Sequence, residues 1–189
     1  MIRSWLGALS LAGLVGMAMA APTRESFDPA RSSASFGVKL RLSGDVPGRF
    51  ERIEGELEPE PDGRWRVRVR VDARDLDLDG PGWMLRSTRS KSFLDVERHP
   101  EIRFTSEPFE RALLLGGGPL QGQLDLRGRS RNVAFTLAPS ACRRPGHGCD
   151  IRVLGRVSRR SFGMNSQRMW LRDEVVFDFR VRLRKAAAP

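Results

Sequence analysis

Side chains that carry proton-transfer chemistry are scarce in this sequence of 189 residues, which contains only two histidines. His99 precedes Pro100 at the expected boundary of an element, and His147 lies in a loop rich in glycine and proline. Neither has the spacing of a metal-binding motif or lies near a Gly-x-Ser-x-Gly nucleophile turn. A catalytic site needs groups that exchange protons, attack or bind a metal. We therefore expect no catalytic residues and predict that the protein is not an enzyme.

The two cysteines, Cys142 and Cys149, are the first and last residues of the segment CRRPGHGC. Residues 1–20 have the pattern of an export signal, and an exported chain meets an oxidising compartment, in which a disulfide is the natural state of such a pair. Two alternatives are free thiols and a metal site made of both cysteines and His147. The metal site has no fourth ligand, so the sequence favours the disulfide.

Carboxylates and glycines offer two further candidate sites. Asp72, Asp75, Asp77 and Asp79 have the alternating spacing of calcium ligands, but the rest of an EF-hand loop is missing. The three glycines from Gly116 lack the Lys and the Ser or Thr of a phosphate-binding loop and indicate a hairpin turn. The sequence therefore predicts no metal and no conventional cofactor.

The formal net charge is +10, which raises the question of an anionic partner. Positive charge attracts nucleic acid or an anionic membrane surface. The arginines alternate along the expected strands instead of forming a block, so we interpret them as a solvated face. Nucleic-acid-binding barrels also expose aromatic rings, whereas this chain has no tyrosine and places its phenylalanines mainly on the expected buried face. No nucleic-acid partner is expected.

The first twenty residues have the features of a secretory signal peptide. Arg3 supplies the positive start, an uncharged apolar stretch follows from Trp5, and Ala18 and Ala20 form the cleavage pattern. The stretch is short for a bilayer span, which disfavours an uncleaved membrane anchor. We expect cleavage after Ala20 and a single periplasmic or secreted domain over residues 21–189.

Apolar and polar residues alternate with a period of two through most of this domain, as expected for strands with one buried face. The clearest run is residues 65–71, in which Trp65 and three valines are separated by arginines. The longest connection, residues 75–100, lies between the third and fourth strands and is expected to hold a short helical segment within residues 84–94. Eight strands are predicted, over residues 36–42, 50–57, 65–71, 102–109, 120–126, 133–137, 151–157 and 175–183.

These strands predict an all-β fold with antiparallel pairing. They either close into a barrel, which removes exposed edges, or form a two-sheet sandwich, and the alternation alone does not separate the two. Gly55, Gly122 and Gly155 fall on the inward phase, where glycine permits sharp bends or leaves room for a ligand. We therefore favour an eight-stranded barrel, whose interior is filled by side chains or holds one small ligand.

The chain resembles the YceI-like family of exported, lipocalin-like barrels associated with polyisoprenoid binding. The resemblance runs from Phe27 to about Leu183, and its most specific piece is the long connection LRSTRSKSFLDVERHPEIRFTS. Further similar segments are FDPARSSASFGVKL, GRFERIEGEL, LQGQLDLRGRSRNVAF and VSRRSFGM. The chain departs from the family pattern at Arg31, at Leu40 and in the segment GPGWML.

This resemblance implies a long hydrophobic cavity and a protein that carries or sequesters an isoprenoid lipid of the polyprenyl or quinone type. The alternative is a filled barrel that acts without a ligand as a periplasmic stress-response or protein-interaction factor. Transient contact with a membrane surface and homodimer formation are compatible with either. The cavity is expected to open near residues 83–93, where Trp83→Ala or Phe93→Ala would alter lipid exchange and affinity.

Large apolar side chains on the inward phase and in the long connection are the candidates for the cavity wall. They are Phe36, Val38, Phe50, Trp65, Val67, Val69, Trp83, Leu85, Phe93, Phe104, Leu124, Phe135, Phe162, Met164, Trp170, Phe177 and Phe179. A phosphate or quinone oxygen of the ligand would need a polar group at the mouth of the barrel. The candidates are Arg86, Arg89, Lys91 and Arg160, for which solvation at the surface is the alternative role.

Overall fold

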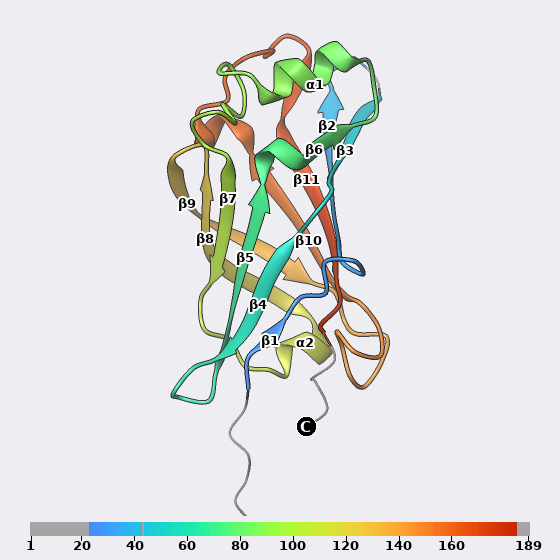
Figure 1. Cartoon of the computed structure of the whole chain (residues 1–189), viewed down its shortest axis with the longest axis vertical. Helices are drawn as coiled ribbons and strands as arrows, with labels where there is room; N and C mark the ends of the chain where they lie inside the picture. The colour runs from blue at the N-terminus through green and yellow to red at the C-terminus, as the bar shows by residue number, and fades with distance from the viewer. Residues whose placement is uncertain (1–22, 43, 185–189) are drawn as a thin grey trace, which may run out of the picture.

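The alternating sequence folds into strands over most of the chain, as the computed structural model of residues 23–42 and 44–184 shows (Figure 1). The strands are β1 (Glu25–Ser26), β2 (Ser33–Leu40), β3 (Asp45–Phe50), β4 (Glu54–Pro59), β5 (Trp65–Asp72), β6 (Leu76–Leu78), β7 (Glu101–Ser106), β8 (Gly118–Leu126), β9 (Arg129–Leu137), β10 (Ile151–Ser158) and β11 (Leu171–Val181). The helical elements are α1 (Gly82–Arg89), α2 (Leu113–Gly116) and the 3-10 turns η1 (Ala73–Asp75) and η2 (Arg159–Phe162).

All eleven strands belong to one sheet, and its ladders are antiparallel. The order of strands is β1-β4-β5-β7-β8-β9-β10-β11-β2-β3-β6. β3 continues along the chain into β4, and β5 into β6, so these two double-length strands lie side by side, with β4 paired to β5 and β3 to β6. From β4 and β5 the pairing runs through β7 to β11 and then, through β2, to β3 and β6. Since β3 continues into β4 and β5 into β6, the same two double-length strands stand at both ends of the order. The sheet is therefore curled into a barrel, consistent with the lipocalin-like architecture and not with a two-sheet sandwich.

The predicted number of eight strands is wrong, because β1, β3 and β6 were not expected. β3 covers much of residues 44–48, where Pro47 and Gly48 indicated a turn. The carbonyl of Pro47 holds it in the strand by accepting the N–H of Asp79 at 3.0 Å, one residue beyond the end of β6. Gly48 is required because the ring of Phe36 lies over it: an added Cβ would come within 2.3 Å of Phe36 Cζ.

The long connection between β6 and β7 contains α1, which starts two residues before the expected segment 84–94 and ends inside it. Pro81 precedes the helix with a φ of −59°, a value suited to the start of a helix. The helix ends at Arg89, and the N–H and hydroxyl of the next residue, Ser90, both donate to the carbonyl of Ser87. Together with the segment between η2 and β11, α1 lies over one end of the barrel (Figure 1). We call this the α1 end.

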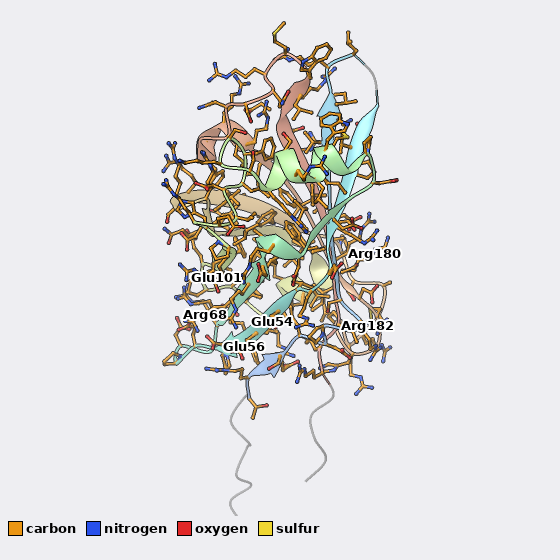
Figure 2. All side chains as sticks on the ribbon, turned by 45° about the horizontal axis from the view of Figure 1, so that its top comes forward. Glu54, Glu56, Arg68, Glu101, Arg180 and Arg182 are labelled. Atoms are coloured by element: carbon orange, nitrogen blue, oxygen red, sulfur yellow. A yellow bond between two sulfur atoms is a disulfide. The ribbon has the colours of Figure 1, made fainter. Side chains whose placement is uncertain are left out.

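Charged side chains cover the outside of the barrel wall and pair across strands. Glu54 lies opposite Arg70 in the β4–β5 register, and their side chains form an ion pair at 3.2 Å. Arg152 and Asp178 form another between β10 and β11, at 2.7 Å. Figure 2 shows Glu54 and Arg68 among the charged side chains on the outer surface. The arginines of the strands are thus a solvated, largely paired face.

Inward-facing glycines accommodate phenylalanine rings instead of leaving room for a ligand. An added Cβ would come within 2.6 Å of Phe27 at Gly55, within 2.7 Å of Phe104 at Gly122 and within 1.9 Å of Phe135 at Gly155. A phenylalanine ring therefore occupies the space beside each glycine. The expectation that these glycines leave room for a ligand is not met, because the sequence alternation gives the inward direction but not the neighbouring side chain.

The predicted disulfide between Cys142 and Cys149 is confirmed. It closes the loop between β9 and β10, in which Gly146 packs on Leu183 near the end of the described chain. The expected signal peptide lies outside the described residues. Within residues 23–42 and 44–184, no helix has the length and apolar character needed to cross a membrane.

The contact between Gly155 and Phe135 predicts a large effect for a small change. Gly155→Ala should lower the free energy of unfolding by about 1–3 kcal/mol, because the new methyl group overpacks the ring. Urea unfolding followed by circular dichroism measures this. Gly37→Ala on β2 is the control, since its Cβ would meet no atom within 4 Å. Equal stability of the two variants would contradict the contact between Gly155 and the Phe135 ring.

Candidate functional site

The inside of the barrel contains an apolar cavity with a volume of about 150 Å³. Its wall runs from Phe27, Leu114 and Leu183 at one end of the barrel to Phe93 and Met164 at the α1 end. Thr88 and Arg159 are the only polar residues that line it in the part of the chain that the structure describes. Such a cavity favours an apolar guest, because nothing along most of its length replaces the hydrogen bonds of water.

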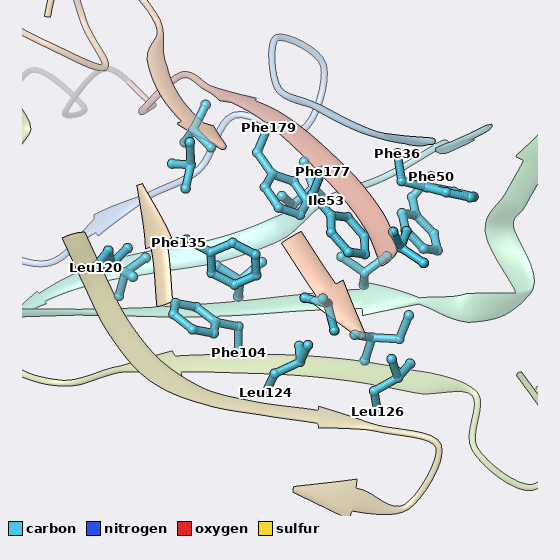
Figure 3. Close-up of a pocket in the computed structure, with 18 of the residues that line it drawn as sticks. Phe36, Phe50, Ile53, Phe104, Leu120, Leu124, Leu126, Phe135, Phe177 and Phe179 are labelled. Carbon is cyan, nitrogen blue, oxygen red and sulfur yellow. The ribbon is translucent and has the colours of Figure 1, made fainter. Parts of the chain in front are cut away.

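Phenylalanine rings meet in the middle of this cavity (Figure 3). Phe177 and Phe179 stack with their centroids 5.6 Å apart, and both lie perpendicular to the ring of Phe135. Phe135 in turn lies 5.0 Å from Phe104 in an edge-to-face contact, while Phe36 links Phe177 to Phe50. We call these six residues the phenylalanine cluster. It narrows the cavity, so a guest with a long chain must displace some of the rings.

Most residues predicted to line the cavity do so. They are Phe36, Val38, Phe50, Val67, Val69, Phe93, Phe104, Leu124, Phe135, Met164, Phe177 and Phe179. Whether they contact a ligand stays a prediction. The strand alternation identified most of them, because a closed sheet has only one inward face.

The other predicted lining residues lie away from the cavity. Trp65 is buried, but its ring packs under the guanidinium of Arg111 at 4.2 Å. Phe162 is buried in η2, and Leu85 packs half-buried on the outside of the core. Trp83 and Trp170 are 58% and 60% exposed at the α1 end, in connections to which strand alternation does not apply.

None of the four predicted head-group residues lines the cavity. Arg86 and Lys91 are exposed, and Arg89 donates to the carbonyls of Arg74 and Leu76. Arg160 forms an ion pair with Asp173 at 2.9 Å. A role in binding a head group stays a prediction for all four, and their places favour surface contacts.

The charged residue that reaches the cavity is Arg159, which the sequence analysis missed. It is only 1% exposed. Its Nη1 donates to the carbonyls of Met164 and Ser166 at 2.8 and 2.6 Å, and its Nε donates to that of Arg172 at 3.0 Å. Arg159 continues the inward phase of Val153, Gly155 and Val157, so the alternation could have identified it.

Arg159 organises the segment from η2 to β11, which we call the η2–β11 loop (residues 163–170). The guanidinium binds the carbonyl of Met164 inside this loop and that of Arg172 just after it, and it lies 5.8 Å from the ring of Phe93. Burial lowers the pKa of Arg159, and the attraction of Asp173 opposes this. The group still remains charged near neutral pH, because arginine titrates far above it. A buried cation thus lies beside the apolar cavity at the α1 end.

Asp173 supports the same region from the other side. Its carboxylate accepts the hydroxyl of Ser158 at 2.6 Å and the N–H of Arg160 at 3.1 Å. Burial raises the pKa of Asp173, but the hydrogen bonds from Ser158 and Arg160 outweigh it and hold the pKa below its usual range. The carboxylate is therefore ionised at neutral pH and fixes the start of η2.

The aspartates considered for calcium do not form a site. Asp72 is bound to Arg74 at 2.6 Å, and Asp77 pairs with Arg49. Among the described residues, no group of three or more His, Cys, Asp or Glu side chains is placed to hold a metal ion.

Comparison with known proteins gives a consistent result for the fold. A family model described as the YceI-like domain matches residues 26–183. No curated protein matches the sequence. Solved structures do match: BcnA of Burkholderia cenocepacia has a TM-score of 0.68 at 17% identity, over 82% of this chain and 98% of that one.

Two other similar structures have comparable scores. A domain from Saccharophagus degradans, described as a polyisoprenoid binding domain implicated in plant cell wall breakdown, has a TM-score of 0.63 at 13% identity, over 83% of this chain and 95% of that one. The YCEI protein of Campylobacter jejuni has a TM-score of 0.60 at 14% identity, over 96% and 100%. At these identities the likeness concerns the fold alone.

The contacts of Arg159 predict a specific instability when it is removed. Arg159→Met should lower the free energy of unfolding by about 1–3 kcal/mol, because buried carbonyls lose their donor. Hydrogen exchange should also become faster in the η2–β11 loop. Arg160→Met is the control, and its half-exposed ion pair should contribute less than about 1 kcal/mol. If both variants unfold at the same urea concentration, Arg159 does not hold the loop.

Proposed function

The chain belongs to the family of YceI-like domains, and on this premise we propose that it binds a long isoprenoid lipid, of the polyprenyl or quinone type, inside its barrel. It carries or sequesters this lipid and does not change it chemically. The observation that carries the proposal is the apolar cavity, whose lining extends along the barrel and, among the residues that the structure describes, has only Thr88 and Arg159 as polar members.

The chemistry of the wall suits such a lipid. An isoprenoid chain offers branched hydrocarbon and no hydrogen-bonding groups, as do the Phe, Leu and Val side chains around the cavity. Each methylene group removed from water contributes about 0.8 kcal/mol. The net affinity is much smaller than the sum of these terms, because the chain loses conformational freedom when it binds.

The position of Arg159 suggests how the lipid is oriented. A phosphate or quinone oxygen is the only polar part of such a ligand, and the buried guanidinium is the only charged group on the wall among the described residues. The polar end would therefore lie near Arg159 and Thr88, and the hydrocarbon would extend towards Leu114 and Leu183. This orientation also leaves the polar end at the α1 end, where we expect the cavity to open.

The similar domain from Saccharophagus degradans supports the proposal, since its description includes polyisoprenoid binding. The support comes from a shared fold at 13% identity, so it concerns the class of ligand and not a particular molecule. We extend the proposal to the expected location of the protein, which is periplasmic or secreted after removal of residues 1–20. The disulfide between Cys142 and Cys149 agrees with an oxidising compartment.

The phenylalanine cluster favours a second candidate function. A cavity of about 150 Å³ is smaller than the roughly 300–1,000 Å³ typical of small-molecule sites. A lipid therefore enters only if rings of the cluster turn aside. A barrel that keeps its rings in place would be a filled scaffold that acts through its surface, as a stress-response or protein-interaction factor.

Native mass spectrometry separates these two functions. The protein purified from its own exported compartment should carry a stoichiometric bound mass, and organic extraction followed by fragmentation should identify it as an isoprenoid. A protein that arrives empty, and that also fails to take up added quinones or polyprenyl lipids, would support the filled scaffold instead.

Filling the cavity provides a test inside the folded protein. Val153→Trp places a large ring on the cavity wall and should raise the Kd for an added quinone by about tenfold or more. Arg156→Trp is the control on the same strand, because Arg156 is exposed and points outward. Circular dichroism checks that both variants are folded. Equal affinities would place the ligand outside the barrel.

A further inference from the structure

Large apolar side chains are exposed to solvent at the α1 end and are not part of the buried core. Leu42, Trp83, Met169 and Trp170 are 86%, 58%, 82% and 60% exposed. We call these four residues the apolar rim. Only one other large apolar side chain is comparably exposed among the described residues, Leu115, which lies at α2 near the opposite end. Exposed apolar groups that gather at one end of a molecule indicate a contact surface.

Hydrogen bonds bring the segments of the apolar rim together. The N–H of Arg41 donates to the carbonyl of Trp170 at 2.9 Å, and its Nε donates to that of Arg168 at 2.8 Å, which sets Leu42 beside the η2–β11 loop. The hydroxyl of Ser166 donates to the carbonyl of Ser92 at 2.8 Å, which ties the same loop to the connection after α1. The rim is therefore one end surface built from three connections.

Basic side chains lie in the same connections as the apolar rim. Arg86, Lys91 and Arg168 are exposed, and none of them forms an ion pair within residues 23–42 and 44–184. Most arginines of the wall strands do form ion pairs, as Arg70 and Arg152 do with carboxylates of neighbouring strands, whereas Arg180 on β11 does not in the described part of the chain. The unpaired cations at the rim are available to an anionic partner.

We propose that the apolar rim and its cations form a docking surface for an anionic phospholipid bilayer. Tryptophan is favoured at the level of lipid head groups, where its ring is partly apolar and its N–H is polar. Arginine and lysine near an anionic leaflet are attracted to phosphates. Trp83 and Trp170 would enter the head-group layer together with Met169 and Leu42. The cations around them would contact lipid phosphates.

The cavity lies directly behind this surface. Thr88 and Phe93 line the cavity from the connection that carries Trp83, and Met164 lines it from the loop that carries Trp170. A protein docked by its rim would therefore face the bilayer with the α1 end of the barrel. The docking surface consists of the apolar rim and its cations, so it does not depend on which molecule the cavity holds.

Vesicle co-sedimentation tests the docking with the intact protein. Vesicles that contain phosphatidylglycerol should bind it, vesicles of phosphatidylcholine alone should bind it much less, and added salt should release it. Tryptophan emission should shift to shorter wavelength on binding, since Trp83 and Trp170 leave water. No binding to phosphatidylglycerol vesicles at low salt would overturn the proposal.

Matched variants locate the contact. Trp83→Ser with Trp170→Ser should weaken binding to these vesicles by about tenfold or more, whereas Leu115→Ser, at the opposite end, should leave it unchanged. Arg86→Gln with Arg168→Gln should weaken it by about fivefold for each lost charge. The charge control is Arg180→Gln, on β11. Binding that the rim variants do not weaken overturns the proposal.

Two further readouts separate this proposal from its alternatives. Light scattering measures whether the protein is a dimer. A protein that is dimeric, becomes monomeric in Trp170→Ser and binds no vesicles would use the rim to contact a second copy of the chain, and this would overturn the proposal. Vesicles free of isoprenoid should bind Val153→Trp as well as the unchanged protein, because docking does not require a filled cavity. Isoprenoid uptake from dilute detergent that persists without any vesicle binding would overturn docking and leave the proposed function intact.

Discussion

The alternation of inward and outward side chains along the strands is the constraint on which the rest of this structure depends. Because the sheet closes on itself through the β2–β11 pairing, an inward side chain has only other inward side chains as neighbours. The same two-residue period puts Val67 and Phe177 on the cavity and Arg70 opposite Glu54 on the outside. A shift of one residue in any register would exchange the two sets and bury arginines without partners. The apolar cavity and the ion-paired wall are therefore two results of one pattern.

Where the strands end, arginine side chains donate hydrogen bonds to backbone carbonyls that no neighbouring strand reaches. The connections at the α1 end leave carbonyls without strand partners, and guanidinium groups satisfy several of them at once. Arg159 reaches the carbonyls of Met164, Ser166 and Arg172, while Arg127 joins those of Gly163 and Lys91. The planar fork of the arginine side chain makes such multiple contacts practical. This end of the barrel is held by side-chain donors, and its apolar side chains remain free to face outward.

Much of the fold was predictable from sequence, and the exceptions have physical causes. The long strands β5 and β11 show a clear alternation, which fixed both their type and their inward faces. β3 escaped prediction because Pro47 and Gly48 usually mark turns, and the contacts that explain the strand, from Asp79 to Pro47 and from the Phe36 ring to Gly48, join residues far apart in sequence. At the site, Trp83 and Trp170 were assigned to the cavity by residue type, whereas they lie in connections where alternation gives no direction. Arg159 was missed for the opposite reason, since its charge concealed an inward position that the phase of β10 indicated.

The brevity of the strands at the two ends of the sheet order has a consequence for the protein at high concentration. β1 has two residues and β6 has three, whereas the ladders between them join strands of six residues or more. An added strand from another molecule needs a long row of unpaired backbone groups, and edges of this length do not provide one. Within the described residues, the barrel therefore offers little template for strand-by-strand aggregation. The apolar inner face of the sheet remains shielded from other molecules as long as β2 stays paired with β11.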